Sequence, residues 1–379
     1  GFEFEDSYNK LPIIHVLPKF HKNPIGFRSI IASKRCGTKS VSQATGWCLT
    51  RILESRRKYC GSVGNNCGFN FYWIINNNSN IRDSLSSLSK RLLARSIETY
   101  DFTTLYTTLD HQDIFTNLDF VIDASMSSGF NLMISGNKAY WTKNFSNGKN
   151  IIDSKRLKDM VRFTVGNTYF EFGDLIFKQN IGILMGTDCA PHLANLMLHV
   201  FESKFMQKML RDKRFDDCNL FLNTFRYIDD ISIVNGSAAL DRYKGDICPN
   251  SLSLKKVNST WYDADILDLN VRIVNRRFIT STFEKRRDFK FSITVFPHHF
   301  TNFPVSMLYN IYAQQVARHA TLNSTLKDFV KNIILLNAAV SDRNYDTNKL
   351  LINFKDAVKR HKVDKKFDIN INSLILKIF

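Results

Sequence analysis

The segment Phe225–Ile233, FRYIDDISI, places two adjacent aspartates between two short apolar runs. A strand interior gives no local reason for two neighbouring acids, because like charges repel and buried carboxylates are costly without partners. At the turn of a hairpin both acids can face outward, and the Asn235-Gly236 pair that follows is typical of a chain reversal. The segment therefore predicts a β-hairpin that presents Asp229 and Asp230. Taken alone, such a pair is more often a turn former than a reactive site.

A third carboxylate precedes this hairpin by about 130 residues. Asp101 lies near the end of the alternating run 97–103, IETYDFT, which predicts a half-buried strand. A neighbouring strand in one sheet would bring Asp101 beside Asp229. Two divalent cations about 4 Å apart need carboxylates from more than one strand, because each ion takes oxygen ligands on several sides. The three acids therefore indicate a site for two Mg²⁺ ions, or Mn²⁺, suited to in-line attack of a 3′-hydroxyl on a nucleotide α-phosphate.

The composition of the 379 residues excludes several classes of protein. Hydrophobic residues make up 44% and charged residues 23%, which is too apolar for a disordered basic tail. No apolar run is long enough to span a membrane, so we expect no membrane partner. The polar first residues are unlike a signal peptide and the 7 cysteines form no CxxC pair, which indicates a reducing, intracellular location. Because residue 1 is not Met, we expect a piece of a longer protein.

The formal charge of +17 is concentrated at the two ends of the chain. Residues 1–95 hold 15 Lys/Arg and 5 Asp/Glu, residues 96–300 hold 25 and 24, and residues 301–379 hold 12 and 6. Two basic ends around a near-neutral middle suit a polyanion that lies across the protein and is processed at its centre. A solvated basic surface would give the same counts, so the charge does not decide the function.

The periodicity of the chain predicts an α+β fold whose strands are mostly antiparallel. Extended segments are predicted at residues 11–22, 27–33, 97–103, 266–274 and 278–283, and helices at 41–59, 154–163, 189–210 and from 306 to about 360. The stretch 112–170 is a long mixed region that is rich in Gly and Asn near 135–150.

Taken in order, the motifs resemble those of a reverse transcriptase, in the branch that holds Penelope-like retroelements and telomerase. The motifs that carry the resemblance are LPKFHKNPIGFRSI (17–30), YDFTTLY (100–106), GILMGTDCAP (182–191), RYIDD (226–230) and DILDLNVRI with STFEKRRDF (265–273 and 281–289). The resemblance covers residues 11 to about 365. It implies a right-hand polymerase with fingers (1–95), a palm with an antiparallel sheet (96–300, with an insertion at about 112–170) and a helical thumb (301–379).

The resemblance also implies an activity and its partners. Members of this branch are RNA-directed DNA polymerases that extend a primer 3′-end with dNTPs on an RNA template by two-metal-ion nucleotidyl transfer. The expected partners are an RNA template, a DNA primer or RNA/DNA hybrid, and dNTP. An endonuclease or RNA-binding module outside these residues and a nuclear location, usual for a retroelement enzyme, are also expected.

Site residues carry over one by one. Asp101, Asp229 and Asp230 match the metal-binding, catalytic aspartates. Tyr106 lies five residues after Asp101, where the family has an aromatic steric gate that stacks under deoxyribose and clashes with a 2′-hydroxyl. Arg28 matches the finger arginine that grips the triphosphate. The other nucleotide-binding candidates are Lys19 or Lys22 as the finger lysine, Phe102, Met185, Gly186, and Lys256 or its neighbour Lys255.

The nucleic-acid-binding candidates are Gly182, Lys285, Arg286, Arg287 and Arg318. Glycines at 182 and 186 would let the backbone pass close to the incoming base and template. Many relatives have Pro and Gln where this chain has Leu184 and Met185, so a side-chain amide contact at 185 is not expected here. The Tyr309–Tyr312 stripe at helical spacing predicts core packing rather than a ligand.

Two other functions share parts of this pattern. A viral-type RNA-dependent RNA polymerase has the same palm, but it normally carries Gly-Asp-Asp and a small polar residue that reads the 2′-hydroxyl. This chain has Ile228-Asp229-Asp230 and Tyr106. A catalytically inert nucleic-acid-binding palm is the third reading, and the intact aspartates disfavour it.

Overall fold

The computed structural model describes residues 10–20, 24–33, 36–127, 129–143, 148, 150–289, 291 and 293–379. The chain forms two compact units: the first comprises Gly1–Asn76 with Glu98–Val257, and the second Asn77–Ile97 with Asn258–Phe379. Each unit is thus built from two separate stretches of sequence. The predicted division into three parts at residues 95 and 300 stays a prediction.

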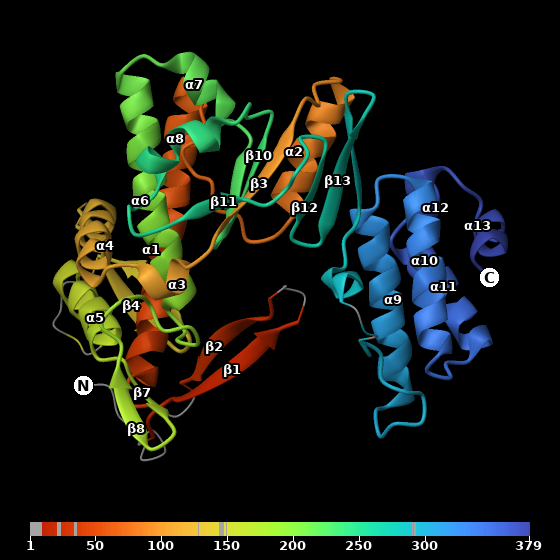
Figure 1. The fold of residues 1–379 in the computed structure, drawn as a ribbon, viewed down its shortest axis with the longest axis horizontal. Helices are drawn as coiled ribbons and strands as arrows, with labels where there is room; N and C mark the ends of the chain where they lie inside the picture. Colours follow the sequence, from red (N-terminus) through yellow and green to blue (C-terminus); the bar gives the residue numbers. More distant parts are fainter. Residues whose placement is uncertain are drawn as a thin grey trace. The chain divides into compact units, whose positions relative to one another are not determined.

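The first unit contains three sheets. Its strands are β1 (Ile13–Lys19), β2 (Gly26–Ala32), β3 (Ile97–Phe102), β4 (Asn131–Ser135), β5 (Lys138–Thr142), β6 (Ile151–Ile152), β7 (Tyr169–Phe172), β8 (Leu175–Lys178), β9 (Thr224–Tyr227), β10 (Asp230–Val234) and β11 (Leu254–Lys256). They pair in the orders β2-β1-β7-β8, β11-β3-β10-β9 and β5-β4-β6. The pairing of β1 with β7 is parallel, and the hairpins β1–β2 and β9–β10 are antiparallel (Figure 1).

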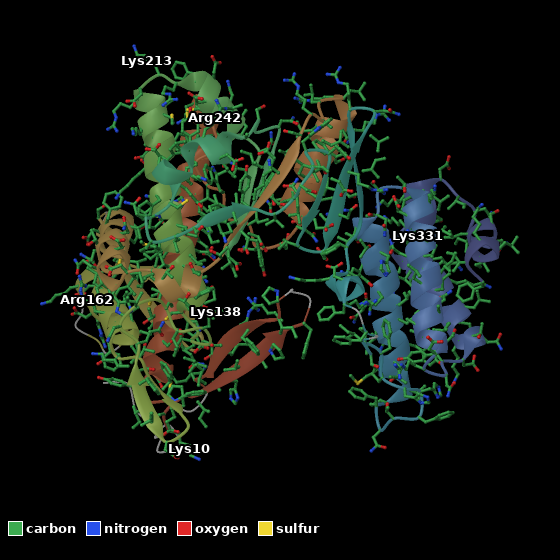
Figure 2. The ribbon with its side chains drawn as sticks, in the orientation of Figure 1. Lys10, Lys138, Arg162, Lys213, Arg242 and Lys331 are labelled. Atoms are coloured by element: carbon green, nitrogen blue, oxygen red, sulfur yellow. The ribbon has the colours of Figure 1, made fainter. Side chains whose placement is uncertain are left out.

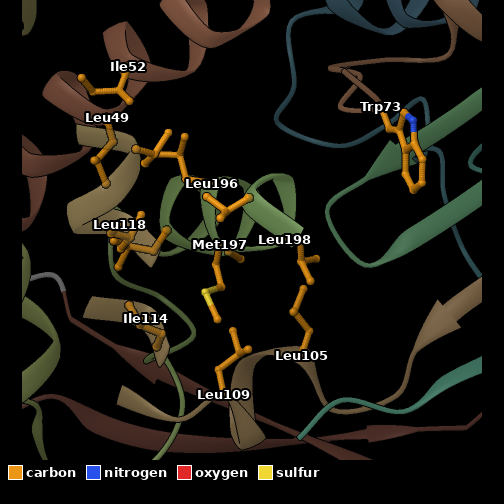
Figure 3. Packing of buried hydrophobic residues seen from close by; sticks show 14 of the residues in the cluster. Leu49, Ile52, Trp73, Leu105, Leu109, Ile114, Leu118, Leu196, Met197 and Leu198 are labelled. Atoms are coloured by element: carbon orange, nitrogen blue, oxygen red, sulfur yellow. The ribbon is translucent and has the colours of Figure 1, made fainter. Parts of the chain in front are cut away.

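Helices of the first unit surround one large apolar core. They are α1 (Lys39–Cys67), α3 (Leu105–Thr108), α4 (His111–Met126), α5 (Ser154–Gly166), α6 (Ala190–Arg211), α7 (Phe215–Leu220) and α8 (Ala239–Ile247). Pro191 is tolerated in the first turn of α6 because no intrahelical donor is needed there. Figure 3 shows Leu105 and Leu109, from the segment after β3, packed against Met197 and Leu198 of α6. This packing holds the segment that follows β3 against α6.

The second unit combines one sheet with a helical region. Its elements are α2 (Ser79–Lys90), β12 (Asp263–Ile266), β13 (Leu269–Val274), β14 (Arg277–Thr282), η2 (Lys285–Asp288), α9 (Val305–Leu322), α10 (Leu326–Ser341), α11 (Thr347–Arg360), α12 (Val363–Phe367) and α13 (Ile371–Ile378). The three strands form an antiparallel meander, and α2 packs on β14. A separate apolar core joins the C-terminal helices and includes Tyr309 and Tyr312, which confirms the core reading of that stripe.

The predicted α+β class with mostly antiparallel strands is confirmed. One predicted strand, 266–274, is wrong in its extent: Leu267 has φ +56° and the chain turns there, ending β12 and starting β13. The turn was missed because it contains no Gly, Asn or Pro and one of its two residues, Leu267, is as apolar as the strands around it. Among the described residues, every helix is too short or too polar to cross a membrane.

Candidate active site

Asp101 lies on strand β3, and Asp229 lies in the turn that leads into the neighbouring strand β10. Asp101 is the penultimate residue of β3, and Asp229 lies in the two-residue turn between β9 and β10, whose Tyr227 and Asp230 pair. The backbone N–H of Phe102 donates to the Asp229 carbonyl at 3.1 Å, which joins β3 to the turn. The sheet order β11-β3-β10-β9 thus places together the acids that the sequence separates.

Several charged groups act on the carboxyl of Asp229. Burial raises the pKa of its carboxyl above the ordinary value, and the negative charge of Asp101 raises it further. The positive charges of Arg28 and Lys19 act in the opposite direction. Asp229 is therefore a half-buried carboxylate that faces a second carboxylate and two cations, whereas Asp230 is exposed at the start of β10.

The two cations come from the hairpin β1–β2. Arg28 pairs with Leu17 across the hairpin, and Lys19 pairs with Gly26. The positive charges of both side chains favour the ionised form of the Asp229 carboxyl, so both lie within electrostatic reach of the acidic turn. Lys22, the other predicted finger lysine, lies outside the described residues.

Tyr106 lies beside the same acidic turn. It belongs to the short helix α3, and its backbone carbonyl accepts a hydrogen bond from the Ile183 N–H at 2.8 Å. Burial, followed by the charge of Asp229, raises the pKa of the Tyr106 phenol to about 12, so the ring stays neutral at physiological pH. The structure thus brings the predicted gate residue and Asp229 into one site.

The loop that contains Gly182 and Gly186 connects this site to β2. Gly182 has φ +88°, its N–H donates to the Leu109 carbonyl at 2.7 Å, and an added Cβ would lie 2.4 Å from the Tyr106 carbonyl oxygen. Gly186 has φ +118°, and an added Cβ would lie 2.1 Å from the Ile31 carbonyl oxygen. Both positions therefore require glycine. Each has a positive φ angle, and each lies so close to the backbone of another segment that a side chain would not fit.

Met185 is held at this loop by its backbone. Its carbonyl accepts a hydrogen bond from the Ile31 N–H at 3.0 Å, and the Gly186 carbonyl accepts one from the Ser33 hydroxyl at 2.6 Å. The Met185 side chain is half-buried. Ser33 and His111, whose Nε2 donates to the Gly182 carbonyl at 2.8 Å, were not predicted from the sequence, because their role depends on contacts between distant segments.

The pairing of β11 with β3 places the adjacent lysines Lys255 and Lys256 on opposite faces of the sheet. Lys255 pairs with Asp101 across β3, and Lys256 pairs with Tyr100. Because side chains alternate along a strand, Lys255 shares the face of Asp101 and Lys256 points to the other face. There the Lys256 amino group lies 3.6 Å from a carboxylate oxygen of Glu98. Of the two candidates, the structure places Lys255 on the face of the acids and Lys256, named for nucleotide binding, away from them.

Phe102 follows the same alternation. Its side chain is 3% exposed and belongs to the core of the first unit. The ring is therefore packed among apolar neighbours, and only the backbone N–H of Phe102 takes part in the site. The sequence motif alone could not distinguish these two faces of β3.

Two of the predicted nucleic-acid-binding cations of the second unit, Arg286 and Arg318, pair with the same acid, Glu284. Glu284 lies 2.6 Å from Arg286 and 3.6 Å from Arg318, and Arg318 also lies 3.4 Å from Asp268. Lys285 is exposed in η2, and the Arg287 side chain lies outside the described residues. Part of the positive charge of Arg286 and Arg318 is thus balanced within the unit.

The donor set at the acidic turn fits hard divalent cations. Mg²⁺ is usually bound through one or two carboxylates and completes its shell with water and substrate phosphates. Asp101 and Asp229 provide two mutually repelling carboxylates, which an intervening cation would relieve. Within the part of the chain that the structure describes, no group of three or more His, Cys, Asp or Glu side chains is arranged to hold a metal ion, so Asp101, Asp229 and Asp230 do not form a three-carboxylate site here.

The fold is similar to solved telomerase structures. Telomerase from Candida albicans, solved in complex with a fragment of telomeric RNA, superposes with a TM-score of 0.63 at 13% identity, covering 98% of this chain and 63% of that one. Apo telomerase from Candida tropicalis gives a TM-score of 0.49 at 11% identity, with 100% and 61% coverage. This chain therefore spans less than two thirds of the telomerase chains that it matches. No protein-family model and no curated sequence matches it.

Proposed function

We propose that the chain is the polymerase core of an RNA-directed DNA polymerase, which extends a primer 3′-end with dNTPs on an RNA template. The observation that carries this proposal is the arrangement around Asp229. One turn is surrounded by Asp101, the cations Arg28 and Lys19, and the ring of Tyr106. The sequence provides these groups from distant segments in the order of the family motifs, and the telomerase-like fold supports the same reading.

In this proposal Asp101 and Asp229, with Asp230, hold two Mg²⁺ ions. When bound, the ions would lower the pKa of the primer 3′-hydroxyl and offset the charge that develops on the phosphates. Arg28 and the finger lysine bind the triphosphate, with Lys19 facing the site and Lys22 as the alternative. Lys255 is the better placed of the late lysines to protonate pyrophosphate, because it shares a face with Asp101.

Tyr106 selects the sugar of the incoming nucleotide. An aromatic ring beside the acidic turn would lie under deoxyribose and exclude a 2′-hydroxyl. The glycine loop, with Gly182, Met185 and Gly186, would pass its backbone beneath the base pair. Lys285, Arg286, Arg287 and Arg318 would bind the primer and template backbone.

The same proposal assigns the predicted architecture of fingers, palm and thumb. Residues 1–95 carry the triphosphate-binding hairpin, 96–300 the acids and 301–379 the helical thumb. We assign the enzyme to a retroelement of the Penelope-like and telomerase branch, acting in the nucleus, with any endonuclease or RNA-binding module encoded outside these residues.

A primer-extension assay tests the function. A labelled DNA primer on an RNA template is incubated with dNTPs or rNTPs and Mg²⁺ or Mn²⁺, beside Asp229→Ala and the exposed-surface control Asp216→Ala. We expect dNTP extension by the wild type and the control and none by Asp229→Ala. Preferred use of rNTPs would indicate an RNA polymerase. Nucleic-acid binding without extension under every condition would indicate an inert palm and contradict the proposal.

A further inference from the structure

Arg226 is a fully buried cation in the strand that leads into the acidic turn. Its side chain is 0% exposed, and its backbone is tied on both sides, since its N–H donates to the Trp73 carbonyl at 2.7 Å and its carbonyl accepts from the Ile75 N–H at 2.9 Å. A guanidinium that is buried away from water requires an acceptor within the protein for each of its N–H donors. The identity of these acceptors therefore indicates the role of the side chain.

All five N–H groups of the Arg226 guanidinium have an acceptor. Nε and one terminal nitrogen donate to the two carboxylate oxygens of Glu202, the second of these bonds being 3.3 Å long. Two donors reach the side-chain and backbone oxygens of Asn195, at 2.8 and 3.1 Å. The fifth donates to the Ile228 carbonyl at 3.0 Å. Glu202 and Asn195 both belong to α6, so Arg226 connects this helix to the turn.

The Ile228 carbonyl belongs to the peptide unit that enters Asp229. Ile228 has φ +56°, a left-handed conformation that a β-branched residue adopts only when its surroundings impose it. The next peptide unit, which leaves Asp229, is held by the bond from the Phe102 N–H to the Asp229 carbonyl at 3.1 Å. The peptide planes on both sides of the Asp229 Cα are therefore fixed, and with them the direction in which its side chain leaves the backbone.

We propose that Arg226 is a positioning residue for Asp229, and that Glu202 and Asn195 hold its guanidinium in place. This inference rests on the proposed function of Asp229 as a metal ligand. Because the guanidinium donors are all used inside the protein, Arg226 does not contact substrate and acts only through the Ile228–Asp229 peptide. A partner that orients a metal ligand commonly changes metal affinity or activity by about 10–100-fold when it is removed.

The decisive variant is Arg226→Lys, which keeps the charge beside Glu202 but has too few donors to reach Ile228 as well. Three measurements are compared with the wild type: the melting temperature, the hydrogen exchange of the amides of residues 227–230, and the affinity for Mn²⁺ measured on the protein without nucleic acid. We expect faster exchange in the turn than in the rest of β9 and β10. We also expect the affinity for Mn²⁺ to be weakened by about tenfold or more. If the protein catalyses primer extension, we expect a lower kcat with little change in KM for dNTP.

The matched control is Arg214→Lys, which alters an exposed arginine that lies 2.8 Å from Asp217 in the same unit. We expect it to leave all three quantities unchanged. If Arg226→Lys does not fold, Glu202→Gln and Asn195→Ala are measured in the same way. A folded variant with unchanged turn exchange and unchanged Mn²⁺ affinity overturns the inference. Because exchange and Mn²⁺ binding need no polymerisation, a failure of the proposed function is distinguished from a failure of this one.

Discussion

At the scale of single residues, Tyr106 offers the most direct test of substrate choice. Replacement by Ala removes the ring that would meet a 2′-hydroxyl, so we expect rNTP incorporation relative to dNTP to rise by about 10–100-fold with some activity retained. The phenol is neutral because its pKa lies near 12, so its charge plays no part. Single-nucleotide extension with each substrate measures the ratio.

Tyr106→Phe is the control for this prediction. It keeps the ring and loses only the hydroxyl, so discrimination should stay near the wild-type value. If the Ala variant still rejects rNTPs as strongly as the wild type, Tyr106 is a packing residue and the gate lies elsewhere.

Asp229 should reduce the stability of the metal-free protein. A carboxyl whose folded pKa is raised holds its proton more tightly in the folded state, so stability falls as pH rises from the ordinary value of 3.8 through the folded pKa. Above that window the ionised Asp229 is a constant cost. We expect Asp229→Asn to be more stable by about 1 kcal/mol at pH 7 in chelator, with no activity.

Thermal unfolding at pH 7 and near pH 4 measures this difference. The advantage of Asp229→Asn should shrink at the lower pH, where a larger fraction of the wild-type carboxyl carries its proton. Equal stability of the two proteins at pH 7 would show that the repulsion between Asp101 and Asp229 is already relieved.

The residue-scale predictions were specific in proportion to how local their signal was. The three aspartates and Tyr106 could be proposed from the sequence because each stands at a fixed spacing within a short motif. Arg226 stood in the same motif, but a buried charge is recognised only from its partners on α6. Whether Phe102 faced the core depended on which side of β3 was covered, and the alternation of residues 97–103 predicted one covered face where the structure buries both.

At the scale of elements, the register of β11 on β3 separates two adjacent lysines. Lys255→Ala should lower kcat by about tenfold, because it removes a cation from the face of Asp101. Lys256→Ala removes a half-exposed ion pair with Glu98 and should cost only about 0.5 kcal/mol of stability. Pre-steady-state extension rates and unfolding curves of the two variants measure the split. Equal kinetic effects would mean that the register does not determine the role.

The glycine loop makes a second prediction at this scale. Gly186→Ala forces a Cβ onto the Ile31 carbonyl at a backbone angle unsuited to alanine, so we expect a loss of about 1–3 kcal/mol and weak dNTP binding. Gly61→Ala in α1 meets no atom within 4 Å and should be neutral or stabilising by about 0.5–1 kcal/mol. Chemical unfolding compares the two, and a stable, active Gly186→Ala would show that the loop moves away from β2.

Elements with strong periodicity were predicted well, and those defined by long-range pairing were not. The helices α5 and α6 and the hairpin β9–β10 follow from apolar spacing and caps such as Asp153, whose side chain accepts from the Arg156 N–H. The parallel contact of β1 with β7 joins segments more than 150 residues apart, and nothing local specifies it. The turn at Leu267 was missed for a related reason, because it lacks the Gly or Asn that usually marks one.

At the scale of the whole molecule, the +17 charge predicts how nucleic acid binds. Each phosphate contact by Lys or Arg releases counterions, so the logarithm of the binding constant should fall linearly with the logarithm of salt concentration, with a slope of about −0.9 per contact on duplex DNA. Fluorescence anisotropy of a labelled primer–template over 50 to 200 mM salt measures this slope. A flat response would mean that the basic ends serve only solubility.

Matched single changes show where the contacts lie. Lys285 is exposed in η2 beside the predicted primer-binding run, so Lys285→Gln should reduce the steepness of the slope by about one unit. Lys213 and Lys138 (labelled in Figure 2) are also exposed but belong to no predicted nucleic-acid-binding segment, and Lys213→Gln and Lys138→Gln should leave the slope unchanged. All three changes remove one positive charge, so a difference between them measures position rather than net charge. If the three slopes agree, nucleic acid is attracted by the total charge of the molecule and the run that contains Lys285 does not form its path.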